Sequence, residues 1–375
     1  MRVAGVMSGT SLDGIDVAIV DIRGRRIKTV AFYSSPYSEA VRQEILSVSN
    51  ATTTTASIAR LHFLLGELYA AAIITACGRH RIPLGSIELV GCHGQTIYHQ
   101  GEREPYLGRS IATTLQIGEA GVIAERIAAP VISDFRTRDV AAGGKGAPLV
   151  PYVDYLLFRH QRLGRVALNI GGIANVTALP PGASSGQVIA FDTGPGNMII
   201  DALASEFTRG RQHFDRDGQI AARGRLSSQL LDSLLAGPYY RRKPPKTAGR
   251  EQYGVKFIGQ LKKSGLSLRD LMATATAFTA STIAVSVERF ITPRMPVDEL
   301  IVSGGGVHNR TLMGYLSSFL PAVRIITSEE FGVGADAKEA VAFAVLAHET
   351  WRGRPANLPS ATGAHHPVIL GKITQ

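Results

Sequence analysis

Cysteine is nearly absent from this sequence, which holds two, Cys77 and Cys92, among 375 residues. Two thiols cannot form a disulfide framework or a zinc site built from cysteines. We therefore expect both side chains to be reduced and buried, with no part in chemistry.

The sequence also lacks a long hydrophobic run. No apolar run approaches the about 20 residues that a membrane-spanning helix needs. A strand pattern begins at Val3, with no basic segment, apolar stretch and small-residue cleavage site before it. Hydrophobic residues make up 45% and charged residues 19%, as in ordinary globular proteins. These features predict a cytoplasmic protein without a membrane partner, long enough for two domains.

Acidic residues are too few to balance the basic ones, so the formal net charge is +10. A nucleic-acid-binding protein would concentrate lysine in a stripe with interleaved aromatic residues. Here arginine is spread along the chain, with one cluster at residues 241–243 and Lys246. We therefore expect no nucleic-acid partner. A basic cleft for anionic ligands and simple solvation of the surface both remain open.

Several catalytic signatures are missing as well. No lysine follows the first glycine-rich turn, so this turn is not a Walker A loop. The sequence shows no nucleophile elbow and no Ser-His-Asp spacing. His365 and His366 lack further ligands at metal-binding spacing, and we interpret them as a solvated loop.

What the sequence does contain is an alternation of strand and helix patterns, interrupted by glycine-rich turns. A strand, turn and strand occupy residues 3–22, a helix 55–80, a short strand 87–91 and a short helix 116–126. The same strand-turn-strand order begins again at Arg165, as a weak internal repeat. We expect an α/β protein with a central cleft between two related domains, residues 1–160 and 161–375.

The first glycine-rich turn follows an apolar strand and offers backbone amides, two hydroxyls and two carboxylates. Glycine lets the backbone approach phosphate oxygens, and carboxylates hold Mg²⁺ through water. A hairpin turn with polar residues is the alternative. The expected phosphate loop comprises Gly9, Thr10, Ser11, Leu12, Asp13, Gly14, Ile15 and Asp16, with Mg²⁺ held through water near Asp13 and Asp16 rather than by a direct metal motif.

Asp192 is the candidate catalytic residue. It follows the apolar strand 189–191 and precedes Gly194-Pro195-Gly196, a rigid turn before the helix at 198–207. Ligands of α/β folds bind at strand ends, where a carboxylate can accept a proton. The hydroxyl of Thr193 is expected to face an anion. The alternative is that Asp192 only caps a helix.

Two further glycine pairs or runs follow apolar strands: Gly171-Gly172, and Gly304-Gly305-Gly306 with Asn309 behind it. Such turns gather backbone amides around phosphates, and the bare backbone at 304–306 also admits a flat purine, so we assign these residues to nucleotide binding. A tight strand-to-helix connection would produce the same pattern.

Polar residues at other strand or helix ends are candidates for binding a hydroxyl-rich ligand. Asp134 and Arg136 resemble a carboxylate and an anion clamp on one loop, although an internal ion pair is the alternative. The apolar residues after Glu339 suggest that this side chain points inward from a helix start. The substrate candidates are His93, Gln95, Asp134, Arg136 and Glu339.

The order of motifs along the chain resembles the anhydro-N-acetylmuramic acid kinase family. The match covers nearly the whole chain, with one departure at Lys145, where glutamine is expected. The motifs are GVMSGTSLDGIDVAIVD at 5–21, HGQT at 93–96, SDFR at 133–136, GGKGAPLVP at 143–151, LNIGGIANVT at 168–177, FDTGPGNMIID at 191–201, FDRDG at 214–218, PPKTAGRE at 244–251, SGGGVHN at 303–309 and DAKEAVAFAVLA at 336–347.

The resemblance implies an actin/hexokinase-type (ribonuclease H-like) fold and a reaction in peptidoglycan recycling. ATP, water and 1,6-anhydro-N-acetylmuramic acid would give N-acetylmuramic acid 6-phosphate and ADP. By this analogy residues 9–16 bind the phosphates, Asp192 activates water, Arg136 and Glu339 contact the sugar, and residues 304–306 line the adenosine site. The expected partner is therefore a small molecule, and a homodimer stays open.

Two other functions remain open at this point. A plain sugar kinase would use Asp192 to deprotonate a substrate hydroxyl. An actin-like structural or chaperone ATPase would turn over ATP slowly without any sugar. Consumption of a 1,6-anhydro sugar distinguishes the predicted enzyme from both.

Overall fold

The structure is a computed structural model, and it describes the chain apart from residues 10, 11, 13 and 25. The chain divides into two compact units, of which unit 1 comprises residues 1–157 and 332–375 and unit 2 comprises residues 158–331. The expected second domain, 161–375, therefore ends too late, because its last 44 residues (375 − 331) pack with the N-terminal unit.

Unit 1 is built on a mixed sheet in the order β12-β6-β4-β1-β2-β3, with β5 paired to β4. Its strands are β1 (Arg2–Ser8), β2 (Gly14–Arg23), β3 (Arg26–Pro36), β4 (Leu89–Tyr106), β5 (Arg109–Ile117), β6 (Val131–Ser133) and β12 (Lys372–Thr374). Its helices are α1 (Glu39–Val48), α2 (Thr55–Arg79), α3 (Ala120–Ile127), α4 (Phe135–Ala141), α5 (Val150–Phe158), α13 (Lys338–Trp351) and α14 (Pro359–Thr362).

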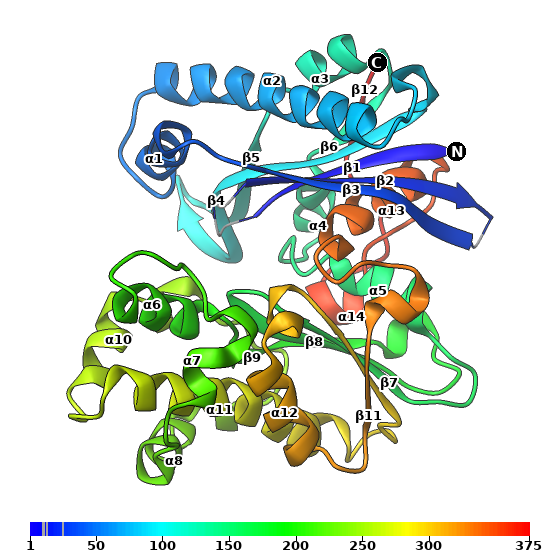
Figure 1. Ribbon diagram of the computed structural model, residues 1–375. Helices are drawn as coiled ribbons and strands as arrows, with labels where there is room; N and C mark the ends of the chain where they lie inside the picture. The colour runs from blue at the N-terminus through cyan, green and yellow to red at the C-terminus, as the bar shows by residue number, and fades with distance from the viewer. Residues whose placement is uncertain (10–11, 13, 25) are drawn as a thin grey trace. The chain divides into compact units, whose positions relative to one another are not determined.

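Both faces of this sheet are buried. The helices α2 and α3 cover one face and α13 covers the other (Figure 1). Along β2, Val17 and Ile19 enter the first core, whereas Ala18 and Val20 enter the second. The sequence of a strand that is buried on both faces is a nearly continuous run of apolar residues. The strand at residues 15–22 is therefore buried on both faces of the sheet.

Two glycines explain why α13 belongs to unit 1. A Cβ on Gly5 would lie 1.9 Å from the Ala340 carbonyl oxygen, and one on Gly91 would lie 2.2 Å from that of Phe343. The backbone of α13 therefore approaches β1 and β4 so closely that only glycine fits on the strands. This contact holds the C-terminal residues against the N-terminal sheet.

Unit 2 repeats the central arrangement with five strands in the order β11-β10-β7-β8-β9. Its strands are β7 (Arg165–Ile170), β8 (Ile173–Leu179), β9 (Ile189–Pro195), β10 (Glu299–Ser303) and β11 (Arg324–Thr327). Its helices are α6 (Met198–Phe207), α7 (Gln219–Ala222), α8 (Ser228–Leu235), α9 (Pro238–Arg241), α10 (Val255–Lys262), α11 (Leu268–Ser286, continued by a π-turn at Val287–Ile291) and α12 (Arg310–Phe319).

The two sheets share one topology. In each, the first strand pairs antiparallel with the second and parallel with the fourth, which gives β3-β2-β1-β4-β6 in unit 1 and β9-β8-β7-β10-β11 in unit 2. The repeat that begins at Arg165 is therefore real at the level of strand order. The predicted α/β class and the ribonuclease H-like sheet in each domain are confirmed.

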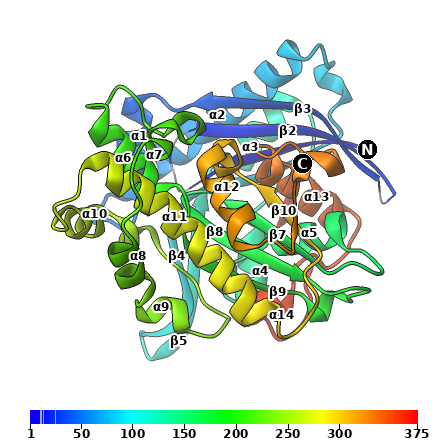
Figure 2. The ribbon, with the colours of Figure 1, turned by 60° about the horizontal axis from the view of Figure 1, so that its bottom comes forward.

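Helix α11 forms the centre of unit 2. It packs against β9 and beside α12 (Figure 2) and shares one hydrophobic core with β7, β8 and β10, and all but a few of its residues are buried. Ala, Thr and Ser dominate its sequence, and their small side chains allow the neighbouring helices α6, α7 and α8 to pack closely against it.

By length and composition, two helices are apolar enough to cross a membrane, contrary to our expectation from sequence. They are α2, with a mean hydropathy of 1.5 over its most apolar window, and α11 with its π-turn, with 1.2. Core helices of soluble proteins pass the same test, and 89% of the α11 window is buried inside the protein. Half of the α2 window is buried, and its apolar residues pack in the first core of unit 1.

The sequence expectations for the polar ends of strands need two corrections. The strand expected at 87–91 continues to Tyr106, so residues 93–96 lie within β4. The helix expected at 116–126 begins only at Ala120, because residues 109–117 form β5 and pair with β4. Polar residues alternate along the paired strands β4 and β5, so the sequence showed no clear apolar strand pattern for either segment.

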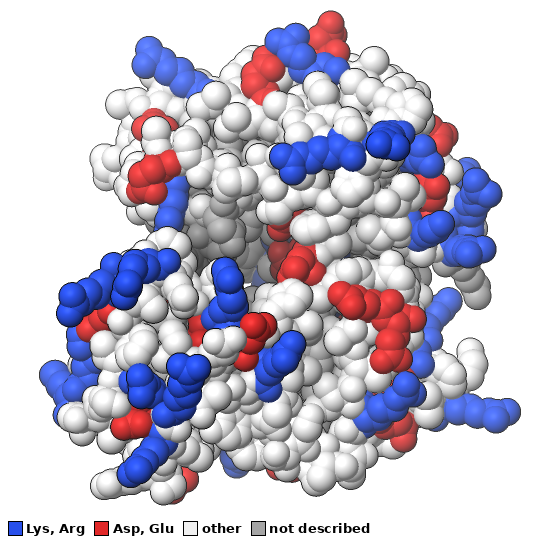
Figure 3. All heavy atoms as spheres, in the orientation of Figure 1, with Lys and Arg blue, Asp and Glu red and all other residues white. Residues whose placement is uncertain are grey.

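On the face shown in Figure 3, charged side chains do not gather in one stripe. The described Lys and Arg residues lie there in small groups with Asp and Glu between them. This distribution agrees with solvation as the main role of the basic excess.

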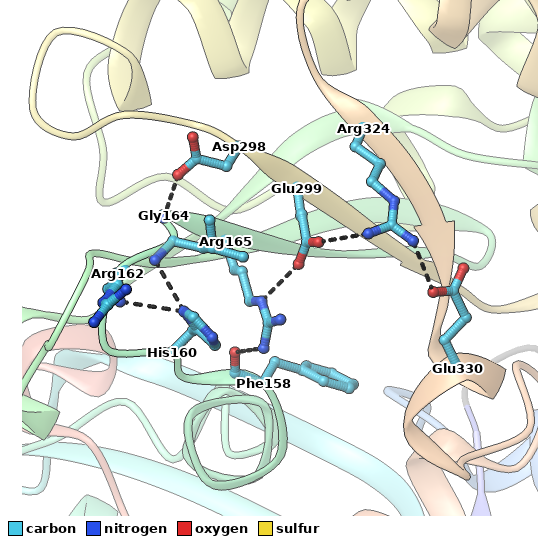
Figure 4. A network of polar contacts seen from close by, with 10 residues as sticks. Phe158, His160, Arg162, Gly164, Arg165, Asp298, Glu299, Arg324 and Glu330 are labelled. Carbon is cyan, nitrogen blue, oxygen red and sulfur yellow. Dashed lines mark hydrogen bonds and ion pairs between the residues drawn. The ribbon is translucent and has the colours of Figure 1, made fainter.

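An ion-pair network with a buried centre at Glu299 joins three parallel strands of unit 2 at their first residues (Figure 4). Glu299 accepts hydrogen bonds from Arg165 Nε at 2.8 Å and from Arg324 Nη1 at 3.2 Å. The side chains of Glu299 and Arg165 are 7% and 11% exposed, so water screens their pairing weakly. The network fixes the register of β7, β10 and β11.

Candidate active site

Asp192 lies on β9, the edge strand of the unit 2 sheet, opposite Asn175 of β8. The strand expected at 189–191 continues to Pro195, so Asp192 lies within the strand rather than at its end. Its carboxylate is partly buried, and Oδ2 accepts a hydrogen bond of 2.8 Å from the backbone N–H of Ala248. Burial raises the pKa of Asp192 to about 6, while the Ala248 N–H and the Lys246 charge act in the opposite direction. The carboxylate is thus ionised at neutral pH and more basic than an exposed aspartate.

Asp192 does not cap a helix. The residue before α6 is Asn197, and no side chain caps that helix start. The neighbouring Thr193 is fully buried and donates its hydroxyl to the carbonyl oxygen of Ala174 at 3.2 Å. The expectation that its hydroxyl faces an anion is therefore wrong, since the backbone already uses this donor.

The two glycine turns of unit 2 lie beside each other. Asn197 donates its backbone N–H to the Gly171 oxygen at 2.7 Å and its side-chain amide to the Ile170 oxygen at 3.2 Å. Gly304 follows β10 with a φ of +83°, and a Cβ there would lie 2.7 Å from the Ile170 oxygen. The turns after β7 and β10 therefore approach each other closely at Gly304, where only glycine fits.

The other residues of unit 2 that we predict to bind the nucleotide differ in the space and the free polar groups that they offer to a ligand. Gly172 and Gly305 have almost open space where a side chain would be, whereas Gly306 packs against the Ile170 side chain. Asn309 caps α12, since its Oδ1 accepts from the Leu312 N–H at 3.0 Å. Its side chain is thus partly committed to the helix start.

The predicted phosphate loop connects β1 and β2 in unit 1, and its residues Thr10, Ser11 and Asp13 lie outside the described part. Leu12 has a φ of +59° and donates its N–H to the Gly9 oxygen at 3.3 Å. The side chains of Leu12 and Ile15 belong to the hydrophobic core. These two residues can therefore offer a ligand only their backbone.

Asp16 is the described carboxylate of that loop. It lies on β2, with Gly14 nearby, and is partly exposed. Within the described ranges, no group of three or more His, Cys, Asp or Glu side chains is placed to hold a metal ion. Mg²⁺ that keeps most of its waters and binds phosphates needs only one or two carboxylates, and Asp16 fits this requirement.

The substrate candidates of unit 1 gather where β1 and β4 end or bend. Ser8 donates its hydroxyl to Gln95 Oε1 at 2.6 Å, and both side chains are buried. Arg136 donates Nε to His93 Nε2 at 3.0 Å and Nη1 to the Gly146 oxygen at 2.8 Å. The structure thus brings His93 and Arg136 together.

Charge in this group centres on Arg136, at the start of α4. Burial lowers its pKa to about 10, and the carboxylates of Glu339 and Asp139 counteract that shift. Glu339 lies in the first turn of α13, so the predicted inward direction agrees with its interaction with Arg136. Arg136 remains a partly buried cation at neutral pH, suited to an anionic group of a ligand.

Asp134 does not pair with Arg136. Its carboxylate accepts a hydrogen bond of 2.8 Å from Lys372 Nζ on β12, and Arg136 lies on a helix rather than on a shared loop. The two residues therefore do not share a loop, and the alternative of an ion pair between them is wrong. The role of Arg136 as an anion clamp stays a prediction.

Sequence reasoning missed two supporting residues. Asp139 is fully buried and accepts hydrogen bonds from the Gly146 N–H at 2.8 Å and from Asn357 and Thr362 at 2.7 Å each, which fixes the loop that binds Arg136. Lys246 lies beside Asp192 and belongs to the motif at 244–251, but no pattern in the sequence indicated a role for this side chain. The departure at Lys145 places its side chain on Glu102 of β4.

Curated relatives cover almost the entire chain. An anhydro-N-acetylmuramic acid kinase of Caldanaerobacter subterraneus subsp. tengcongensis is 47% identical over 99% of this chain and 96% of the relative. One of Bacillus cereus is 45% identical over 100% of this chain and 99% of the relative.

Solved structures are much more distant. Component A of (R)-2-hydroxyglutaryl-CoA dehydratase from Acidaminococcus fermentans is 12% identical with a TM-score of 0.48, over 93% of this chain and 98% of that one. A ROK family glucokinase from Streptomyces griseus, in complex with glucose and AMPPNP, is 13% identical with a TM-score of 0.40, over 93% of this chain and 100% of that one. Likeness at this level supports no conclusion on activity.

The family assignment rests instead on the sequence. The profile of the family described as anhydro-N-acetylmuramic acid kinase matches residues 1–375, every residue of the chain. Together with relatives at 45–47% identity, this match shows that the chain belongs to the anhydro-N-acetylmuramic acid kinase family.

Proposed function

We propose that this chain is an ATP-dependent kinase that opens 1,6-anhydro-N-acetylmuramic acid with water and phosphorylates O6, in the cytoplasmic recycling of peptidoglycan. The observation that carries the chemistry is Asp192: a partly buried strand-edge carboxylate with a pKa raised to about 6, held by a backbone N–H. A base of this strength is deprotonated at neutral pH and still accepts a proton effectively.

In the proposed reaction, Asp192 accepts a proton from water, and the water oxygen attacks the anomeric carbon. The bond between C1 and O6 breaks, and O6 attacks the γ-phosphorus of ATP. The bond from that phosphorus to the bridging oxygen breaks, and ADP leaves. Asp192 then releases its proton to solvent. The products are N-acetylmuramic acid 6-phosphate, ADP and one proton, so atoms and charge balance.

We assign the other residues by what their contacts allow. The Arg136 guanidinium suits the carboxylate of the muramic acid, with His93 and Glu339 beside it. The backbone of residues 9–16 and the turns at 171–172 and 304–306 suit ATP. Asp16 would hold Mg²⁺ through water, and the ion would neutralise phosphate charge in a transfer that depends on positioning and electrostatics.

The deciding experiment measures ADP release with ATP alone, with ATP and free N-acetylmuramic acid, and with ATP and the 1,6-anhydro sugar. The proposal expects fast turnover only with the anhydro sugar. Equal or faster turnover with free N-acetylmuramic acid would identify a plain sugar kinase. Turnover that ignores both sugars would identify an ATPase of the actin-like class.

A further inference from the structure

Lys246 is a lysine enclosed by aromatic rings, only 2% exposed. Its Nζ lies 4.7 Å from the ring centroids of Tyr239 and Phe290 and 5.7 Å from that of Phe191. The same nitrogen donates to the Tyr239 carbonyl oxygen at 3.4 Å. Burying an ammonium is costly unless its surroundings compensate, and aromatic faces together with an acceptor do so.

Residues around this lysine hold Asp192 through three hydrogen bonds. The Asp192 N–H donates to the Lys246 oxygen at 3.1 Å, along the outer edge of β9. The Ala248 N–H donates to Asp192 Oδ2 at 2.8 Å, and the Tyr239 hydroxyl donates to the Asp192 carbonyl oxygen at 2.7 Å. The segment that Lys246 anchors is therefore the one that fixes both the backbone and the carboxylate of the aspartate.

The charged groups around the lysine are few. Burial, followed by Arg289 and Arg242, lowers the pKa of Lys246 to about 8, while Asp192 acts to raise it. The Lys246 charge in turn lowers the pKa of Asp192 against the effect of burial. Tyr239 and Tyr253 also face Asp192, and burial raises both phenol pKa values, so these groups stay neutral.

We propose that Lys246 is a positioning residue for the catalytic base: its ammonium, enclosed by Phe191, Tyr239 and Phe290, anchors residues 246–248 on the edge of β9 and thereby aims and polarises the Asp192 carboxylate. This inference rests on the proposed function of Asp192. Lys246 itself touches no reacting atom. A 1 Å misplacement of a catalytic group typically costs up to about 100-fold in rate.

The test compares Lys246→Met, which keeps the length of the side chain without its charge, with Lys243→Met at an exposed position of the same segment. For Lys246→Met we expect kcat to fall by about tenfold or more, with KM for both substrates within about threefold. The acid limb of kcat should also move to higher pH, because Asp192 loses the cation that lowers its pKa. Lys243→Met should match the wild type.

A purely structural role would lower kcat without moving the acid limb, and that result, like wild-type activity, would overturn the proposal. If Lys246→Met does not fold, Lys246→Arg decides. Wild-type activity should decline as pH rises through about 8 and the lysine loses its proton. A guanidinium keeps its proton, so this decline should disappear in Lys246→Arg, and its persistence would overturn the proposal.

Asp192→Asn, measured in parallel, separates the two hypotheses. Near-normal activity of Asp192→Asn would contradict both the role of Asp192 as the general base and the role of Lys246 in positioning it. A severe loss in Asp192→Asn combined with an unchanged pH profile in Lys246→Met would leave the proposed function standing and overturn only the role of Lys246.

Discussion

Arg136 donates its Nε–H to Nε2 of His93, 3.0 Å away, while Nδ1 of the same imidazole lies 2.7 Å from the Gly94 oxygen. A guanidinium has no acceptor, so Nε2 must carry the lone pair and Nδ1 the proton. Burial, together with Arg136, lowers the pKa of His93 well below its usual value. His93 is therefore a neutral acceptor that orients Arg136, rather than an acid or base.

This relationship predicts the effect of His93→Leu. Arg136 loses the acceptor for Nε, and we expect KM for the anhydro sugar to rise by about tenfold or more, as for the loss of a hydrogen bond to a charged group. KM for ATP should change less than about twofold. The exposed His366→Leu is the control. An unchanged sugar KM in folded His93→Leu would contradict the role of His93 in orienting Arg136.

The turn after β10 allows a test of backbone geometry. Gly304 has a φ of +83° and no room for a Cβ, whereas a Cβ on Gly305 would meet only Asn197 Nδ2, at 3.7 Å. We expect Gly304→Ala to lower the free energy of unfolding by about 1–3 kcal/mol and Gly305→Ala by less than about 0.5 kcal/mol. Denaturant titration followed by circular dichroism measures both values. Equal values for the two variants would show that position 304 does not require glycine.

Asp192 and the glycine turns became candidates from the sequence because a local pattern marks them: apolar strand residues, then a polar residue or glycine. The assignment of 332–375 to unit 1 was not accessible in this way. It depends on Gly5 and Gly91, which lie far from α13 in sequence and give no local sign that a helix approaches them. Strand order is likewise a long-range property, which the repeat at Arg165 only suggested.

The same distinction explains the site. Asp192 could be named as a candidate from the sequence, whereas the residues around it could not, because Phe191, Tyr239 and Phe290 come together around Lys246 only in the folded chain. Asp134 and Arg136 show the opposite failure. Two residues apart in sequence, they suggested a pair, but Lys372 reaches Asp134 from the other end of the chain.

The network at Glu299 predicts a local loss of stability. Glu299→Gln leaves the nearly buried Arg165 without its counter-charge, and we expect a cost of about 3 kcal/mol. Hydrogen exchange of the β7 and β10 amides measures this cost as a lower opening free energy in unit 2. Glu206→Gln, which breaks an exposed pair with Lys262, should change exchange by less than about 0.5 kcal/mol. Similar effects in the two variants would show that burial does not strengthen the Glu299 network.

Asp192 gives the most direct prediction for the chemistry. Asp192→Asn keeps the shape of the side chain and removes its basicity, and loss of a general base typically costs about 10²–10⁴-fold in rate. Because the pKa of Asp192 is raised to about 6, wild-type kcat/KM should fall as pH drops through about 6 and the carboxylate takes up its proton. Ring opening and phosphorylation should fail together in the variant, while ATP and sugar still bind.

Isotope labelling then identifies which molecule Asp192 activates. If the base directs water to the anomeric carbon, a reaction run in ¹⁸O-water and quenched before anomeric exchange places the label at C1 and none in the phosphate. If water instead attacked the γ-phosphorus, the label would appear in phosphate and the sugar ring would stay closed. Because the anhydro sugar has no free 6-hydroxyl, phosphorylation of O6 requires that C1–O6 break. Label in the phosphate, or ring opening at near-normal rate by Asp192→Asn, would therefore contradict the proposed role of this carboxylate.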